Sequence, residues 1–167
     1  EKLWDDRNNQ LGLRPETVNF KLIADGDYST AQEVNITSSD NWKNTLTVPK
    51  YDADGETITY TVDEDSIAVG NGLRYVPTVN GLTITNTISK DITLTKIWKD
   101  NTNAYTTRPT SVTFVVKQNG NAFKNVTVTG DYSTNTWTKL ISVPYMNSSG
   151  NIYTYSIEEV STSGYTS

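Results

Sequence analysis

Cysteine and histidine are both absent from this sequence of 167 residues. Without cysteine, the chain has neither a disulfide to stabilise a small domain nor a thiolate nucleophile. Without histidine, it lacks the side chain that most often serves as an acid or base at neutral pH and as a metal ligand. These absences exclude Ser-His-Asp and Cys-His catalysis. We expect no cofactor and no metal site.

A strong positive charge and a long apolar run are lacking as well. The net charge is −5 and the lysines and arginines are scattered, so nothing matches the electrostatic footprint of a nucleic-acid-binding protein. No stretch approaches the roughly 20 apolar residues that a membrane helix requires. Neither a signal peptide nor a sorting tail is recognisable. We therefore expect an acidic surface protein that neither binds nucleic acid nor inserts into a membrane.

What the sequence does contain is an internal repeat of one module. Lys2-Leu3-Trp4 returns as Lys96-Ile97-Trp98. With the same spacing, lengthened once by a single residue, the following residues recur in register: Arg14 and Arg108, Phe20 and Phe114, Trp42 and Trp137, Pro49 and Pro144, Tyr60 and Tyr155, Glu64 and Glu159. A long repeat of this kind predicts two domains, residues 1–89 and 90–167. Each core is small and therefore marginally stable unless something reinforces it.

Composition and alternation predict an all-β chain. Thr, Asn, Ser, Tyr and Val are abundant, and apolar residues recur at every second position. The predicted strands contain Val18 to Leu22, Val34 to Ile36, Trp42 to Val48, Ile58 to Val62, Leu82 to Ile88, Val112 to Val116, Val126 to Val128, Trp137, and Ile152 to Ile157. This pattern predicts two tandem small β-sandwich modules, immunoglobulin-like or prealbumin-like. Residues 86–96 contain no glycine or proline, so a stiff, extended connection joins the modules.

The alternation also points polar side chains into the predicted cores. Residues two apart on a strand share a face, which places Lys96 beside Leu94 and Trp98, and Lys2 beside Trp4. By the same rule, the strand with Tyr60 and Val62 turns Glu64 inward, and the strand with Tyr155 and Ile157 does so for Glu159. The strand that contains Ile84 and Ile88 carries Asn86 on its apolar face.

A lysine, a glutamate and an asparagine in one apolar interior would be costly as independent groups, at several kcal/mol for each unpaired charge. Burial favours their neutral forms. A neutral amine is a nucleophile, and a protonated carboxyl can donate a hydrogen bond to the asparagine amide oxygen. These are conditions for attack of Lys Nζ on the Asn side-chain carbonyl with loss of ammonia. The product would be an intramolecular isopeptide bond.

At this point the sequence resembles a tandem of Cna protein B-type (CnaB) domains, the stalk modules of Gram-positive surface proteins and pili. The segments that carry the resemblance are residues 2–10, Arg14-Pro15-Glu16, Asn41-Trp42-Lys43, Pro49 to Asp52, Tyr60 to Asp65 and Ile84 to Thr87, with Thr95 to Trp98, Arg108-Pro109, Trp137 and Tyr155 to Glu159 in the second module. The resemblance implies an isopeptide bond between Lys2 and Asn86, with Glu64 as the catalytic acid or base.

For the second module the resemblance implies Lys96 as the bonding lysine and Glu159 as the catalytic residue. No counterpart of Ile84-Thr85-Asn86 follows Glu159, so this module lacks its last strand and Lys96 lacks a partner. Either the sequence is cut from a longer array of neighbouring repeats, or strand exchange with another chain supplies the missing strand. The second alternative follows because a sandwich without its terminal strand leaves an edge open to strand addition.

Simpler interpretations exist for each residue. Lys2 and Lys96 could extend their ammonium groups to water from a strand end. A register slip could leave Glu64 solvated between two aspartates. Two groups of acidic and amide residues could be calcium loops, although turns rich in Asp and Asn look the same without metal: Asp5, Asp6 and Asn8, and Asp52, Asp54 and Glu56.

Two functions follow as hypotheses. The first is a structural stalk or spacer of a cell-wall-anchored, extracellular surface adhesin of a Gram-positive bacterium, in which a single autocatalytic reaction replaces enzymatic turnover. The second is a ligand-binding adhesin module that recognises a host protein or glycan, which a large exposed apolar patch would favour. A carbohydrate-active enzyme is disfavoured, because most carboxylates fall in turns rather than in a paired arrangement.

Overall fold

The computed structural model describes residues 1–165 and confirms the all-β prediction. Within this part of the chain, the only helical element is a single 3-10 turn, Tyr28–Thr30. The chain divides into two compact units with a boundary between Ser89 and Lys90, and the short segment Ser148–Gly150 is grouped with the first unit. We refer to them as unit 1 and unit 2.

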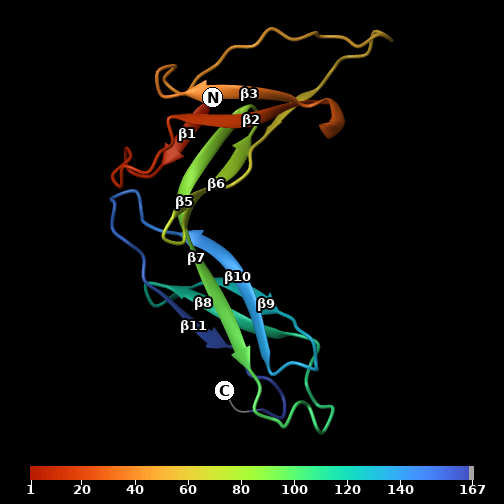
Figure 1. Ribbon diagram of the computed structural model, residues 1–167, viewed down its shortest axis with the longest axis vertical. Coiled ribbons are helices and arrows are strands. Elements are labelled where there is room, and N and C mark those ends of the chain that lie inside the picture. The colour runs from red at the N-terminus through yellow and green to blue at the C-terminus, as the bar shows by residue number, and fades with distance from the viewer. Residues whose placement is uncertain (166–167) are drawn as a thin grey trace. The chain divides into compact units, whose positions relative to one another are not determined.

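Unit 1 contains two sheets (Figure 1). One has the order β3-β2-β4, formed by Gln32–Thr37, Thr17–Ala24 and Tyr60–Asp63. The other has the order β1-β7-β6-β5, formed by Lys2–Asp5, Thr83–Ile97, Leu73–Asn80 and Ile67–Gly70. Alternating apolar residues of these strands supply the buried core: Val18, Ile23, Val34, Ile36, Val62, Tyr75, Ile84 and Ile88.

β1 and β7 form a parallel pair, which brings the start of the sequence next to its middle. Lys2 pairs with Ile84, and Trp4 pairs with Asn86. β7 continues past the boundary into unit 2, where Leu94 and Lys96 are buried. The extended connection predicted between residues 86 and 96 is therefore confirmed as part of one continuous strand.

Unit 2 contains a sheet with the order β11-β8-β9, formed by Tyr155–Glu159, Val112–Gln118 and Asn121–Val128. β10 (Thr136–Pro144) pairs with β7. Its apolar core cluster consists of Leu94, Trp98, Val112, Phe114, Val116, Val126, Val128 and Trp137. In the described part of unit 2, β11 is the last strand. Counterparts of β5 and β6 are thus absent there, in addition to the last strand that the sequence led us to expect to be missing.

The strand predicted at Trp42 to Val48 does not form. Residues 43–49 have no regular structure, and Trp42 has a positive φ of 59°. In unit 2, the corresponding β10 pairs with β7, in the residues ahead of Trp98. In unit 1, the Lys2 backbone amide donates to the Trp42 carbonyl at 2.8 Å, but residues 43–49 pair with no strand among the described residues. Strand-like alternation alone therefore does not make a strand, because a strand also requires a backbone partner.

Two further details differ from the prediction. The hairpin of β5 and β6 was not predicted, although its Asn71-Gly72 turn is a strong hairpin signal. Ile157, predicted to be buried, is 45% exposed, whereas its counterpart Val62 in unit 1 is 7% exposed. None of the helical structure described is long and apolar enough to cross a membrane.

Candidate functional site

Two neighbouring strands bring Lys2 and Asn86 to the same interior. Both residues lie within the parallel β1-β7 pair, and alternation directs both side chains away from solvent. Glu64 follows directly after the last residue of β4, in the opposite sheet. Residues from the two ends and the middle of unit 1 therefore meet in its core.

The Glu64 carboxylate bridges the other two side chains. Lys2 Nζ donates to Glu64 Oε2 at 2.5 Å, and Asn86 Nδ2 donates to Glu64 Oε1 at 2.7 Å. Lys2 is 2% exposed, Glu64 7% and Asn86 0%. Lys2 does not extend its ammonium group to water, and Glu64 does not lie on the solvated side of its strand. The structure thus brings together all three residues that the sequence singled out in the first module.

Burial governs the electrostatics of Lys2. Desolvation lowers the pKa of its amine below the usual value, and the hydrogen bond and charge of Glu64 oppose this without reversing it. An amine with a lowered pKa is neutral in a larger fraction of molecules at neutral pH. The site therefore favours the nucleophilic form of Lys2 while placing a proton acceptor against it.

One contact differs from the expectation. We expected a protonated carboxyl to donate to the asparagine carbonyl oxygen, but Glu64 accepts from the amide nitrogen Nδ2. A carboxylate oxygen that accepts a hydrogen bond pairs with the NH₂ group of the amide and not with its carbonyl oxygen. Asn86 Oδ1 is buried and has no hydrogen-bond partner. The carboxylate thus contacts the prospective nucleophile through one oxygen and the prospective leaving group through the other.

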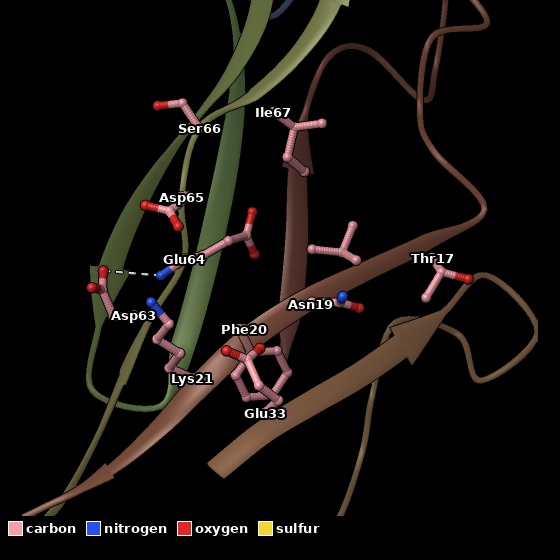
Figure 2. Close-up of a pocket in the computed structure, with 11 residues that line it drawn as sticks. Thr17, Asn19, Phe20, Lys21, Glu33, Asp63, Glu64, Asp65, Ser66 and Ile67 are labelled. Carbon is pink, nitrogen blue, oxygen red and sulfur yellow. Dashed lines mark hydrogen bonds between the residues drawn. The ribbon is translucent and has the colours of Figure 1, made fainter. Parts of the chain in front are cut away.

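A pocket adjoins this buried carboxylate. Figure 2 shows Glu64 among the residues that line a hollow between β2 and the segment 63–67, together with Lys21 and Ser66. The volume of the pocket is about 580 Å³. The Glu64 side chain is only 1% exposed, although Glu64 is one of the residues that line this hollow.

In unit 2 the structure places Lys96 and Glu159 together without an asparagine. Lys96 Nζ donates to Glu159 Oε1 at 2.6 Å and to Oε2 at 2.7 Å. Their side chains are 9% and 11% exposed, compared with 0% and 1% for Lys2 and Glu64. Lys96 also lines a cavity of about 490 Å³. In unit 1 one carboxylate oxygen of Glu64 contacts the lysine and the other contacts the Asn86 amide, whereas in the described part of unit 2 both oxygens of Glu159 contact Lys96.

Comparison with known families decides where the chain belongs. The Cna protein B-type domain family matches residues 1–87 and again residues 92–167. The chain belongs to this family. The first CnaB match contains Lys2, Glu64 and Asn86, and the second contains Lys96 and Glu159. The family resemblance stated from the sequence is thereby confirmed.

CnaB relatives come from bacterial adhesins. The chain is 37% identical over 173 residues to the collagen adhesin of Staphylococcus aureus, which covers 99% of this chain and 14% of the adhesin. It is 37% identical to a crystallised single B repeat unit of the collagen-binding surface protein of that organism, with 99% of this chain and 86% of that chain covered and a TM-score of 0.45. The pilus adhesin SpaC of Lactobacillus rhamnosus GG is 21% identical, with 98% and 20% covered and a TM-score of 0.41. The chain therefore spans a small part of these adhesins.

A second polar cluster in the first CnaB unit was not predicted. Asp6, directly after β1, is 2% exposed. Its Oδ1 accepts from Arg14 Nη2 at 2.5 Å and from the Asn9 backbone amide at 2.9 Å. Its Oδ2 accepts from Arg14 Nε at 2.7 Å and from the Tyr75 hydroxyl at 2.8 Å. Burial tends to raise the pKa of Asp6, but these hydrogen bonds outweigh it and hold the pKa below its usual value.

The same cluster recurs in the second CnaB unit. Arg108 Nε donates to Asp100 Oδ2 at 2.7 Å, and its Nη2 donates to Oδ1. The Tyr165 hydroxyl donates to Asp100 Oδ2 at 2.9 Å, and the Asn103 amide donates to Oδ1 at 3.1 Å. The signal was present in the repeat, since the Asp, Asn and Arg positions are retained in register in both modules. The repeat did not reveal the two tyrosines. Tyr75 and Tyr165 are not in register, because they lie at different distances along the sequence from Glu64 and Glu159.

The acidic turns have a structural explanation. Asp6 is saturated by Arg14, Tyr75 and a backbone amide. Asp52 Oδ1 accepts from the backbone amides of Asp54 and Glu56, at 3.0 and 2.8 Å, as turn-forming aspartates commonly do. In residues 1–165, no group of three or more acidic, cysteine or histidine side chains is placed to hold a metal ion.

Proposed function

We propose that this chain is a stalk module of a bacterial surface adhesin, and that unit 1 is closed by a self-formed amide bond between Lys2 and Asn86. The observation that carries this proposal is the Glu64 bridge: one carboxylate hydrogen-bonds the Lys2 amine and the Asn86 amide nitrogen at the same time. A structural ion pair would require only the first contact. The second places a proton carrier at the leaving group.

The reaction balances with these three side chains alone. In the neutral form of Lys2, the amine lone pair attacks Cγ of Asn86 while Glu64 takes one proton from Nζ. The Cγ–Nδ2 bond then breaks as Glu64 returns the proton to Nδ2, so ammonia leaves and a secondary amide remains. Nothing is oxidised or reduced. Each chain reacts once, so the process is a maturation step and not enzymatic turnover.

The surroundings of the site support this chemistry. Desolvation increases the neutral fraction of Lys2. The pocket beside Glu64 offers ammonia a short way out. Because the buried Asn86 amide is enclosed by protein, water has little access to compete with the amine at Cγ.

The bond would suit a load-bearing role. It would tie the first strand of unit 1 to its closing strand, so that tension entering through β1 would pass into β7 along a covalent path. For a loop of about 84 residues, the chain-entropy argument used for disulfides gives about 4–5 kcal/mol of stabilisation. This compensates for the absence of cysteine in a small domain.

The relatives suggest the setting. A collagen adhesin and a pilus adhesin contain similar segments, and we propose an extracellular, cell-wall-anchored location with neighbouring repeats as the principal partners. Ligand recognition is the weaker alternative. The large exposed apolar side chains belong to both units, with Leu3 in unit 1 and Val160 in unit 2 among them, and a spacer does not require them to form one recognition surface.

In unit 2 we propose that a strand bearing an asparagine completes the site. The pairing in unit 1 supports this proposal, since β7 runs parallel to β1 and Asn86 pairs with Trp4. The equivalent strand would place its asparagine opposite Trp98, within reach of Lys96 and Glu159. A neighbouring repeat, or strand exchange with a second chain, would supply it.

The intact mass of the denatured chain, combined with peptide mapping, tests the proposed bond. We expect a loss of about 17 Da, equal to one ammonia, with the Lys2 and Asn86 peptides joined. Mapping is essential, because cyclisation at an Asn-Gly pair such as Asn71-Gly72 removes the same mass.

A Lys2→Arg chain, which keeps the charge, should have the unmodified mass, whereas Lys90→Arg, at an exposed position, should behave like the natural sequence. Unjoined peptides in the natural sequence would rule out the bond and leave a buried ion pair. A loss of ammonia mapped to any other pair of residues would equally overturn the assignment.

A further inference from the structure

The buried Asp6, Arg14 and Tyr75 cluster has no part in the amide exchange, yet its contacts converge on the residue beside Lys2. The Arg14 guanidinium lies 5.3 Å from the centroid of the Trp4 ring, and the Tyr75 ring meets Trp4 edge-on at 4.8 Å. Trp4 Nε1 is buried and makes no hydrogen bond. The position of Trp4 therefore depends on what surrounds its ring and not on a polar contact of its own.

Trp4 in turn covers the amine. Lys2 and Trp4 are two residues apart on β1, so their side chains share a face, and Lys2 Nζ lies 5.3 Å from the Trp4 centroid. Glu64, which directly follows β4, contacts the amine, and the Trp4 ring lies beside the amine. Trp42 packs edge-on against the same ring at 4.8 Å. The Trp4 ring thus contacts both the Lys2 amine and two members of the cluster, Arg14 and Tyr75.

The arrangement is repeated in unit 2 although the chain reaches it by a different path. Trp98 lies 4.7 Å from Lys96 Nζ, 5.4 Å from Arg108 Cζ and 4.9 Å from the Tyr165 ring. In unit 1 the tyrosine is on β6, after the β5-β6 hairpin, whereas Tyr165 follows Glu159 through a short turn. The same contacts formed through loops of different length indicate that the contacts, and not the loops, are what the sequence retains.

Building on the proposed function, we propose that Asp6, Arg14 and Tyr75 form a clamp that holds Trp4 over Lys2. The three clamp residues and Trp4 would then be positioning residues for the amide exchange. The ring excludes water from the amine. A cation above an aromatic face is attracted to it, but a single ring stabilises an ammonium group less than loss of hydration destabilises it. The net effect is to favour the neutral, attacking amine.

The charged and titratable groups around Lys2 define the expected pH dependence. They come from three elements: Glu64 at the end of β4, Asp6 and Arg14 in the connection after β1, and Tyr75 on β6. The facing residues of β7, Ile84 and Asn86, do not titrate. Replacing Trp4 by leucine leaves the four titratable groups in the sequence and changes only the access of water to the amine.

The test follows bond formation with time in unreacted full-length chain, purified in urea and diluted into buffers from about pH 5 to pH 9. Loss of ammonia is measured by mass after acid quenching, and folding is monitored separately by circular dichroism. Trp4→Leu lets water reach the amine, so the pKa of Lys2 rises toward its usual value. We expect the rate profile to move to higher pH, with at least about a tenfold loss of rate at neutral pH for each pKa unit.

Tyr75→Phe keeps the ring but removes the hydroxyl that contacts Asp6, and it should shift the profile in the same direction by a smaller amount. It also keeps the test valid if Trp4→Leu does not fold. Tyr28→Phe, at an exposed tyrosine that donates to Asp63, is the matched control and should leave the profile unchanged.

The outcomes separate the two proposals. A natural chain that folds but never loses ammonia would overturn the proposed function and the clamp together. A natural chain that reacts, with variants that follow the same profile or are slowed equally at every pH, would overturn the clamp alone, because that result would show a purely structural role. A shift of the profile to higher pH in every variant that folds supports the clamp, and a folded variant without that shift overturns it.

Discussion

Glu64 is the residue on which the proposed chemistry depends, because its two oxygens contact different partners. Glu64→Gln keeps the size of the side chain but cannot accept a proton from Lys2. We expect bond formation to slow by at least about 100-fold, the usual contribution of a positioned acid or base. Intact mass and mapping of the Lys2 and Asn86 peptides provide the measurement.

Asp65→Asn is the matched control for that substitution, since it removes one carboxylate from an exposed neighbouring position. This chain should bond normally. If Glu64→Gln joined its peptides as fast as the natural sequence, Glu64 would be only an ion-pair partner of Lys2, and the proton transfer would need another carrier.

At this scale, the sequence predicted the three site residues but not the clamp. Lys2, Glu64 and Asn86 were found because strand alternation reports which side chains point inward. Asp6 is held by a turn in which Arg7, Asn8 and Asn9 all have positive φ. Its other partner, Tyr75, lies far away in sequence. Neither a left-handed turn nor a long-range contact produces a periodic pattern in the sequence, so strand alternation could not predict the clamp.

At the scale of elements, the sequence correctly predicted the extended structure of β7 but wrongly predicted a strand from Trp42 to Val48. β7 has unbroken alternation and lacks glycine and proline. The segment from Trp42 to Val48 alternates equally well, yet residues 43–49 have no regular structure. Strand propensity describes how side chains fit a sheet, but backbone pairing requires a neighbour, which a local pattern does not reveal.

The incomplete edge of unit 2 leads to a prediction about a strand supplied from outside. A synthetic peptide with the sequence of residues 82–90 contains the Asn86 position and its apolar flanks. Incubated with the full chain, it should become attached to Lys96, with a mass increase equal to the peptide minus about 17 Da. Mass spectrometry and mapping of the adduct would locate the bond.

Two controls accompany the peptide. A version with alanine in place of its asparagine should bind without forming the bond, and a Lys96→Arg chain should form no adduct with the original peptide. Attachment at an exposed lysine such as Lys90, or equal labelling of the Lys96→Arg chain, would show that unit 2 does not provide the proposed site.

At the scale of the whole molecule, the two units should differ in stability although they share a family and a core pattern. Unit 1 contains all three residues of the proposed bond, whereas in the described part of unit 2 Lys96 pairs with Glu159 alone. We expect unit 2 to unfold at a lower urea concentration. Hydrogen exchange resolved by peptide, measured across a urea series, would follow each unit separately.

The same measurement on Glu64→Gln should lower the free energy of unfolding of unit 1 by at least about 4 kcal/mol, the chain-entropy contribution of the bond. Peptides from unit 2 should keep their transition. A comparable loss in both units would indicate that the substitution acts through general destabilisation and not through the missing bond.

The parallel pairing of β1 with β7 has a consequence for the order of events in folding. Lys2 meets its strand partner Ile84 only after nearly the whole of unit 1 has been synthesised, and such distant contacts form slowly. Asn86 arrives through that same late pairing. Amide exchange at this site would therefore have to follow assembly of the module, so that each joined pair of peptides would be a chemical record of a domain that had already folded correctly.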